Sequence, residues 1–293
     1  MAVLIYALVG LGLCGVVYVV FIEPRWFHLG HVRVPVRGEF PGPLRILHIT
    51  DTHLRKGHAT TAKMRFLKGL AEHEVDFVFA TGDMIDNPSG IEYCVEALDA
   101  LKPRYGTYFV LGGHDHNDIT ILDTLHHLTH FRTSRRATRA NEVDRLQEQL
   151  KEVGVTTLVN ENVRVPVDNG EIVLIGLDDP FLDRHDLDGA MEGIADGDAT
   201  IMLVHAPDIV DEIAEHGIDA VFCGHTHGGQ IRVPFIGAMV TRCSLDPREA
   251  CGLLRRKNTA FHLNRGLGAG WMTDFRFWCR PEATIVDLVP EEE

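Results

Sequence analysis

The sequence predicts an α/β domain that follows one N-terminal transmembrane helix. Apolar runs of strand length alternate with segments whose apolar residues recur at helical spacing, which is typical of a layered α/β domain with buried central strands. Residues 2–22 contain no charged side chain and are long enough to cross a bilayer core of about 30 Å as a helix. The remaining chain is long enough for one large core. We therefore expect an anchor at 1–23, a juxtamembrane linker at 24–43 and one domain at 44–293.

The expected strands are short apolar runs, and most of the expected helices lie between them. Strands are predicted at 44–50, 75–80, 107–111, 171–177, 200–204 and 219–223. Helices are predicted near 208–215, at 89–101, and at 60–73, where one face carries Met64, Leu67, Leu70 and Ala71. The segment 116–142 is longer than a plain connection needs, and we expect it to be a lid-like insertion.

The apolar N-terminal run predicts a retained anchor rather than a cleaved signal peptide. No basic residue precedes the run, and no small-residue cleavage site follows it. Arg25, Arg33 and Arg37 lie after it, so the positive-inside rule predicts a single-pass protein with its domain in the cytoplasm. The next large apolar side chains are Trp26, Phe27 and Leu29. Two interpretations remain open for them: they lie in the headgroup layer of the membrane, or they pack on the domain.

Charge and cysteine content narrow the function further. A formal net charge of −14 argues against a nucleic-acid binder, which would be basic. An acidic protein that handles phosphate must create its positive field locally, with metal ions or an arginine cluster. The six cysteines form no C-x-x-C pair, so a reduced compartment is the simpler interpretation. A disulfide remains open among Cys243, Cys251 and Cys279.

Five polar clusters each follow the end of a predicted strand. They are ITDTH (49–53), TGDMIDN (81–87), GGHDHND (112–118), VHAP (204–207) and CGHTHGG (223–229). In an open α/β sheet, sites form in the crevice outside the carboxyl ends of the strands. Clusters that share this edge therefore predict one common site.

The residue types in these clusters are those of a metal centre. Side chains two positions apart in extended backbone point to the same side. Asp51 pairs with His53 in this way, and His225 with His227, so each pair can hold one cation. Asp83 follows a glycine, and its two oxygens can bridge metals about 3.5–4 Å apart. His205 ends a further strand and adds a ring nitrogen. Mixed imidazole and carboxylate ligands favour Mn, Fe or Zn over Ca or Mg.

Along this chain the motifs are D-x-H, G-D, G-x-H-D, H and G-H-x-H. In order and spacing they resemble the motifs of the calcineurin-like metallophosphoesterases. The resemblance covers roughly residues 44–290 and implies a four-layer α/β/β/α sandwich with two divalent ions at the sheet edge, Mn being favoured. It implies a first metal held by Asp51, His53, Asp83 and His227. It implies a second metal held by Asp83, His205 and His225. In the same resemblance, the catalytic residue beside the substrate is His114, oriented by Asp115.

Gly113 departs from the family pattern. The family usually has asparagine there, and its amide oxygen binds the second metal. His116, Asn117 or water are candidates to fill the position. The alternatives are a weak second metal or a degenerate domain that binds without turnover.

The C-terminal motifs narrow the resemblance. GHTHGGQIRVP, LNRGLG and RPE resemble a membrane-anchored subgroup that includes bacterial phosphodiesterases and one form of the UDP-2,3-diacylglucosamine diphosphatase of lipid A synthesis. This implies a protein of the bacterial inner membrane. Within the expected insertion, an apolar helix face precedes a basic cluster made of Arg132, Arg135, Arg136 and Arg139. This pattern suits a lid over a lipid pyrophosphate or contact with an anionic membrane surface, and the alternative is a helix packed on the domain with a solvated basic turn.

We therefore expect a membrane-anchored phosphoesterase that hydrolyses a phosphodiester or pyrophosphate bond, in a lipid-linked substrate such as UDP-2,3-diacylglucosamine. One alternative is a phosphodiesterase that acts on a soluble nucleotide or other small phosphorylated molecule. The other is a non-catalytic binding module crippled at Gly113. The sequence does not predict an oligomeric state.

Overall fold

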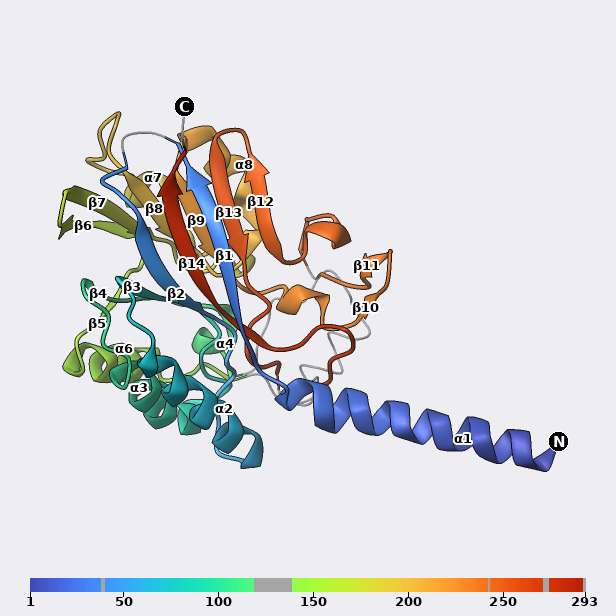
Figure 1. Ribbon diagram of the computed structural model, residues 1–293. Coiled ribbons are helices and arrows are strands. Elements are labelled where there is room, and N and C mark those ends of the chain that lie inside the picture. Colours follow the sequence, from blue (N-terminus) through green and yellow to red (C-terminus); the bar gives the residue numbers. More distant parts are fainter. Residues whose placement is uncertain (38–39, 119–138, 242, 271–273, 292–293) are drawn as a thin grey trace.

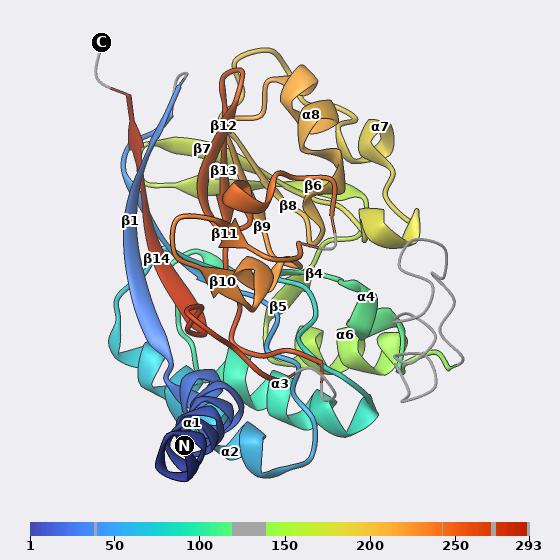
Figure 2. The ribbon, with the colours of Figure 1, turned by 90° about the vertical axis from the view of Figure 1, so that its right-hand side faces the viewer.

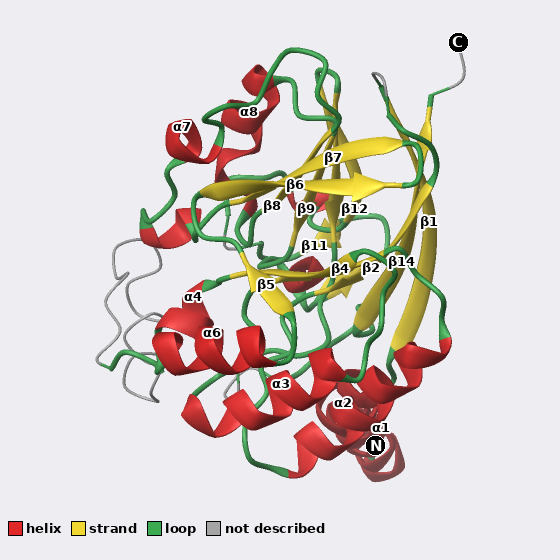
Figure 3. Cartoon of the chain, turned by 90° about the vertical axis from the view of Figure 1, so that its left-hand side faces the viewer, coloured by secondary structure: helices red, strands yellow, loops and turns green. Residues whose placement is uncertain are grey.

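The computed structural model describes residues 1–37, 40–118, 139–241, 243–270 and 274–291 (Figure 1). In these residues, two six-stranded sheets pack face to face between two layers of helices. Helices α2, α3 and α6 cover one sheet, and α7 and α8 lie over the other (Figure 3). This is the four-layer α/β/β/α arrangement that the sequence predicts.

The first sheet combines a parallel core with two strands from the ends of the domain. Its order is β1-β14-β2-β3-β4-β5, and β2 to β5 run parallel. The strands are β1 (His28–Val36), β2 (Leu44–Ile49), β3 (Phe77–Thr81), β4 (Gly106–Val110), β5 (Val155–Thr157) and β14 (Glu282–Pro290). The covering helices are α2 (His58–Gly69), α3 (Ile91–Asp99) and α6 (Val143–Glu152).

The second sheet has the order β12-β13-β9-β8-β7-β6, with a parallel centre from β13 to β7. Its strands are β6 (Glu161–Val167), β7 (Gly170–Gly176), β8 (Thr200–Leu203), β9 (Ala220–Cys223), β12 (Gly252–Arg256) and β13 (Thr259–Leu263). Its helices are α7 (Leu187–Ala190) and α8 (Val210–Ile213). A short hairpin, β10 (Arg232–Val233) with β11 (Gly237–Ala238), stands apart from both sheets.

The core between the sheets explains why the central strands read as unbroken apolar runs. Phe77 and Phe79 of β3 point into the space between the sheets, where Phe79 meets Phe222 of β9 edge to face at 5.0 Å between ring centroids. Val78 and Ala80 point the other way, into the core under the helices. Because both faces of the strand are buried, alternation of polar and apolar residues disappears.

Nearly half of the segment predicted as a juxtamembrane linker, 24–43, belongs to the domain instead. Residues 28–36 form β1, which pairs in parallel with β14 over nine residue pairs. Phe27 stacks on Phe66 of α2 at 5.2 Å, and Leu29 also packs against the core, which favours packing over a headgroup layer for these two residues.

Smaller departures concern two helices and the cysteines. Ala71 is exposed because α2 ends at Gly69 and a 3-10 turn follows. The helix expected near 208–215 contains four α-helical residues between 3-10 turns. All six cysteines are free.

The N-terminal helix projects from the domain, and its last turns are tied to it. It runs through α1 (Ala2–Val17) and two further helical turns to Arg25, and it is the one helix in the described residues that is long and apolar enough to cross a membrane. Its residues up to Val17 have no contact with the core (Figure 1). The Arg276 N–H donates to the Val19 carbonyl at 3.0 Å, and the buried Glu23 carboxylate accepts from the Cys279 N–H.

The two ends of the expected insertion lie side by side. Asn117 and Ala140 form an antiparallel bridge, and the Asp118 N–H donates to the Arg139 carbonyl at 3.0 Å. The interior of the insertion, residues 119–138, lies outside the described residues, and the lid therefore remains a prediction.

Candidate metal centre

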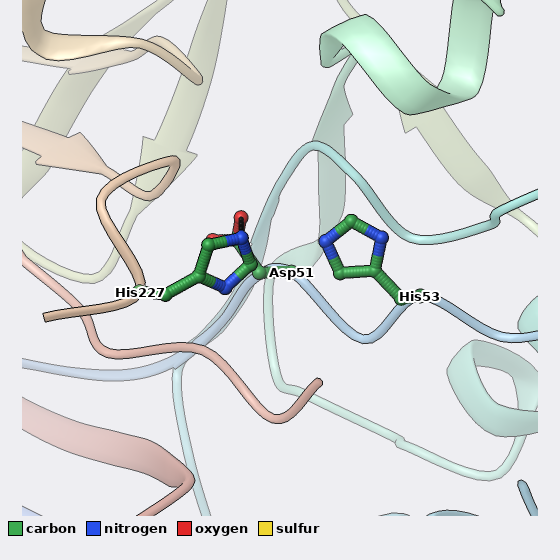
Figure 4. Close-up of side chains that lie close together, drawn as sticks. All are labelled: Asp51, His53 and His227. Carbon is green, nitrogen blue, oxygen red and sulfur yellow. Dashed lines mark ion pairs between the residues drawn. The ribbon is translucent and has the colours of Figure 1, made fainter. Parts of the chain in front are cut away.

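The predicted metal ligands meet at the edge where the parallel strands of both sheets end. Asp51 follows β2, Asp83 follows β3, His205 follows β8 and His225 follows β9. Three groups have ligand atoms within 4.8 Å of one another: Asp51, His53 and His227; His53, Asp83 and His114; and Asp51, Asp83 and His205. Figure 4 shows the first group, in which His53 stands on the same loop as Asp51 and His227 comes from a second loop.

Most of these ligands have a backbone conformation that is uncommon for their residue types. A positive φ is found at Asp51 (48°), His53 (46°), Asp83 (51°), His225 (68°) and His227 (50°). Such a φ costs of the order of 1–3 kcal/mol at a non-glycine residue, and it persists where the surrounding structure enforces it. Glycines supply the close approach, because a Cβ at Gly112 would collide with the Asp83 carboxylate and one at Gly224 would collide with that of Asp51.

Asp83 has the central position that a bridging ligand requires. Its Oδ2 lies 3.2 Å from His205 Nε2 and 3.7 Å from His53 Nε2. Its Oδ1 accepts a hydrogen bond of 2.7 Å from the His114 N–H. One oxygen is therefore fixed by the backbone, and the other faces ring nitrogens from both predicted metal sites.

Hydrogen bonds on the outer side of the rings set which nitrogen faces the centre. His53 Nδ1 lies 2.7 Å from Asp86 Oδ1, and His205 Nδ1 lies 2.7 Å from the Thr81 carbonyl. Because these partners accept, Nδ1 carries a proton in each ring, and Nε2 is the atom that can bind a metal ion once it is deprotonated.

The inner atoms of this cluster fit a metal ion. His53 Nε2, His205 Nε2 and Asp51 Oδ1 are buried and have no hydrogen-bond partner among the described residues. Buried polar atoms without a partner are rare in folded proteins. His53 and Asp51 stand in one group of possible ligands and His205 and Asp51 in another, and ring nitrogens with carboxylate oxygens are the donor types of divalent cations.

The pKa values show a strongly negative field at the same place. Burial disfavours a charged His205 ring, but the nearby carboxylates, Asp83 first, together outweigh burial and raise the pKa of His205 well above its ordinary value. Burial also opposes ionisation of Asp83, yet the rings of His205 and His114 hold its pKa well below its usual range. Protons on the histidines thus compensate charge that divalent cations would compensate when bound.

His114 lies at the rim of the cluster, as expected for a residue beside the substrate. Its ring packs edge to face on His53 at 4.5 Å between centroids, and its side chain is 21% exposed, whereas that of His53 is fully buried. Burial disfavours the imidazolium, but the carboxylates of Asp83 and Asp86 raise the pKa of His114 to about 8.

The expected role of Asp115 is wrong. Its carboxylate accepts hydrogen bonds from the backbone N–H groups of Met84 (2.9 Å), Ile85 (3.1 Å) and Gly112 (3.0 Å), so it holds two loops together instead of orienting a ring. The carboxylate that faces His114 is Asp86, whose Oδ1 lies 3.3 Å from His114 Nδ1. Asp86 stands in the TGDMIDN cluster, and nothing in the sequence separates it from an ordinary turn residue.

The two side chains expected to fill the position left by Gly113 do not reach it. His116 Nε2 pairs with Asp178 Oδ1 at 2.6 Å, and Asn117 Nδ2 donates to the Gly113 carbonyl at 3.0 Å. The side chain that lies against Gly113 is Asp179. The LDDP stretch after β7 is a sixth polar cluster at the same edge, and its position at a strand end is the signal that reveals it.

Of the predicted arginine cluster, the structure describes only the last residue. Arg132, Arg135 and Arg136 lie outside the described residues. Arg139 is exposed, with its guanidinium 3.6 Å from Asp118 Oδ2. A role in substrate binding therefore stays a prediction.

Comparison with known proteins agrees with this geometry. The sequence profile of the calcineurin-like phosphoesterases matches residues 44–229. The chain belongs to this family. It is a phosphoesterase of the hydrolase class, and its family implies divalent metal ions, for which the cluster around Asp83 provides the ligands.

The relatives are bacterial and animal proteins. The chain is 29% identical over 246 residues to the metallophosphoesterase YkoQ of Bacillus subtilis, covering 83% of this chain and 82% of YkoQ. It is 25% identical over 274 residues to the phosphodiesterase YaeI of Escherichia coli, covering 93% and 92%. It is 28% identical over 218 residues to a transmembrane protein with a metallophosphoesterase domain from Bos taurus, covering 68% of this chain and 44% of that protein.

Proposed function

We propose that this phosphoesterase is anchored in a membrane and hydrolyses a phosphodiester or pyrophosphate bond in a lipid-linked substrate, of which UDP-2,3-diacylglucosamine is an example. The observation that carries the proposal is an exposed apolar surface on the side from which α1 projects. The positive-inside argument and the resemblance to a bacterial subgroup favour the cytoplasmic face of the bacterial inner membrane.

The apolar surface lies around the β10–β11 hairpin. Its exposed side chains are Trp26, Phe235, Ile236, Met239, Val240, Phe277 and Trp278. Viewed along α1, the hairpin lies on the face from which the helix emerges (Figure 2), and from the side it projects in the same direction (Figure 1). With α1 across a bilayer, this face would front the lipid, and aromatic side chains suit the interface between headgroups and acyl chains.

Backbone contacts join this surface to both the helix and the metal centre. The Phe277 N–H donates to the Gln230 carbonyl at 2.9 Å, and the neighbouring Arg276 N–H donates to Val19 in the helix. On its other side, four residues, Gly228 to Ile231, separate β10 from His227. An exposed apolar patch beside an active site marks a surface for lipid or protein contact, and a helix anchor nearby favours lipid.

The chemistry of the site fits hydrolysis of a phosphoric ester. Bound divalent ions, with Mn favoured, would neutralise phosphate oxygens and lower the pKa of water. In the metal-free protein the carboxylates of Asp83 and Asp86 outweigh burial and raise the pKa of His114 to about 8, and the protonated ring can donate a proton to the leaving oxygen. Asp86 holds the imidazolium at the rim, and Asp83 holds the His114 backbone through its N–H.

Substrate comparison tests the proposal. The full-length chain in phospholipid vesicles with Mn²⁺ is assayed on UDP-2,3-diacylglucosamine, on a soluble nucleotide pyrophosphate and on bis-p-nitrophenyl phosphate. We expect the highest kcat/KM on the lipid substrate. Preference for the soluble pyrophosphate would leave the anchor only a locating role, and no turnover of any substrate would make the domain a binding module.

A further inference from the structure

The carboxylate of Asp179 is buried next to the metal centre, and the ligand set described above gives it no role. Asp179 follows β7, the neighbour of β8 in the second sheet, and its side chain is fully buried. Its Oδ1 accepts a hydrogen bond of 3.1 Å from the Phe181 N–H and caps the 3-10 turn Pro180–Leu182. Its Oδ2 has no hydrogen-bond partner in the described part of the chain. One oxygen thus holds the turn, and the other is left for a ligand.

The unpartnered oxygen lies where a side chain at position 113 would begin. A Cβ added to Gly113 would stand 3.2 Å from Asp179 Oδ2, which is closer than an ordinary van der Waals contact. The φ of Gly113 is not positive, so the backbone does not need glycine there. What glycine provides at this position is room for the carboxylate.

The segment that carries Asp179 also contacts a ligand of the second metal. The Phe181 ring packs against that of His225 at 5.0 Å between centroids. His225 belongs to the second metal in the expected ligand set.

We propose that Asp179 Oδ2 is a ligand of the second metal ion, together with Asp83, His205 and His225. It takes the place that the family resemblance assigns to an asparagine at position 113. The inference rests on the two-metal centre of the proposed function. It also makes the centre more anionic, since a carboxylate replaces a neutral amide, and oxygen ligands of this kind favour Mn²⁺ over softer cations.

Metal content tests the inference without reference to turnover. Full-length protein in detergent is loaded with Mn²⁺ and desalted, its manganese is counted by elemental analysis, and Mn²⁺ binding is titrated by calorimetry. We expect two ions per wild-type chain and one per Asp179→Ala chain. The second-site affinity should fall at least about 10–100-fold, the loss typical of an outer-shell partner alone.

The matched control is Asp178→Asn. Asp178 is the adjacent buried carboxylate, but it pairs with His116 and Arg184 rather than facing the ligands. Its Oδ1 also accepts from the Asp179 N–H at 2.8 Å, and the asparagine oxygen can still accept this bond. We expect this variant to keep two ions. Circular dichroism of the metal-free proteins shows whether each variant is folded.

Substitution at position 113 gives a second, independent test. Gly113→Asn alone should crowd Asp179 and weaken the second site, whereas Gly113→Asn combined with Asp179→Ala should regain part of the lost affinity. This pair decides the question if Asp179→Ala alone does not fold. Unchanged binding by Asp179→Ala, or tighter binding by Gly113→Asn alone, would overturn the assignment of Asp179 while leaving the two-metal function intact. A wild-type chain that holds fewer than two ions would overturn the two-metal function itself.

Discussion

Replacement of Asp86 by asparagine tests whether one carboxylate serves both a metal ligand and the substrate-facing histidine. Asp86 Oδ1 lies 2.7 Å from His53 Nδ1 and 3.3 Å from His114 Nδ1, and its Oδ2 accepts from Arg55 at 3.1 Å. Burial opposes its ionisation, but His53 and His114 outweigh burial and lower the pKa of Asp86. The carboxylate is therefore charged at neutral pH, and asparagine removes that charge with little change in shape.

The expected magnitudes follow from these contacts. Loss of the charged partner of a ligating histidine typically lowers metal affinity about 10–100-fold. In the metal-free protein, loss of an opposite charge this close should lower the pKa of His114 from about 8 by at least about one unit. A raised folded-state pKa stabilises the protein fully below the unfolded value of about 6.5, and this stabilisation is lost as the pH rises through about 8. Its size is about 2 kcal/mol, most of which Asp86→Asn should remove.

Two measurements check these values. Calorimetric titration with Mn²⁺ gives the affinity, and NMR titration of the metal-free protein gives the pKa of His114. Asp178→Asn is again the control, because it removes a carboxylate that pairs with a histidine, His116, outside the ligand set. Unchanged Mn²⁺ affinity together with an unchanged pKa of His114 would refute the dual role of Asp86.

Further predictions concern catalysis, stability and the membrane. His114→Gln should lower kcat/KM about 10²–10⁴-fold with manganese content unchanged, and it should abolish the fall in activity that deprotonation of this ring causes as the pH rises; equal loss of metal would make His114 structural. Arg276→Met should lower the free energy of unfolding by about 3 kcal/mol or more, because the buried guanidinium donates to several loop carbonyls. Chemical denaturation measures this loss, and a loss below about 1 kcal/mol would contradict the structural role of Arg276. Replacing Phe235 and Ile236 together by serine should reduce turnover of the lipid substrate in vesicles and spare bis-p-nitrophenyl phosphate, and an equal effect on both argues against membrane contact. Chelation of the metal should lower the melting temperature. The expected loss of stability is about 2.7 kcal/mol if the free metal concentration was 100 times its Kd. An unchanged melting temperature would mean that the folded chain holds no metal.

The ligands could be predicted because their residue types and positions are both distinctive. Aspartate and histidine two apart after an apolar run are unusual, and the strand directly before them places them at the sheet edge. Asp51, Asp83 and His205 therefore appear where the sequence predicts them. The outer partners are less distinctive: Asp86 is one of several turn aspartates, and its pairing with His53 joins loops 33 positions apart.

The strand at 28–36 shows a different reason for failure. Pro35 weakens the strand signal of this segment, since proline cannot donate a hydrogen bond inside a sheet. In the structure β1 is an edge strand, with β14 on its single paired side, so proline is tolerated there. The same holds for Pro166 in β6, the edge strand of the second sheet. Edge strands are stabilised by pairing with distant segments, and local sequence carries little of that information.

Hydrogen bonds join the loops of the metal centre to one another. These bonds explain how a ligand at one sequence position can be replaced by a ligand at another. The Asp51 N–H donates to the Gly82 carbonyl at 3.0 Å, the His53 N–H donates to the Asp83 carbonyl at 3.0 Å, and Asp115 binds the backbone at Met84. None of these bonds involves a side chain at position 113. The backbone that carries the ligands is therefore independent of the residue there, and an asparagine can be lost without collapse of the site. Replacement of that ligand needs only space and an unpartnered oxygen within reach, and Gly113 and Asp179 provide these two things.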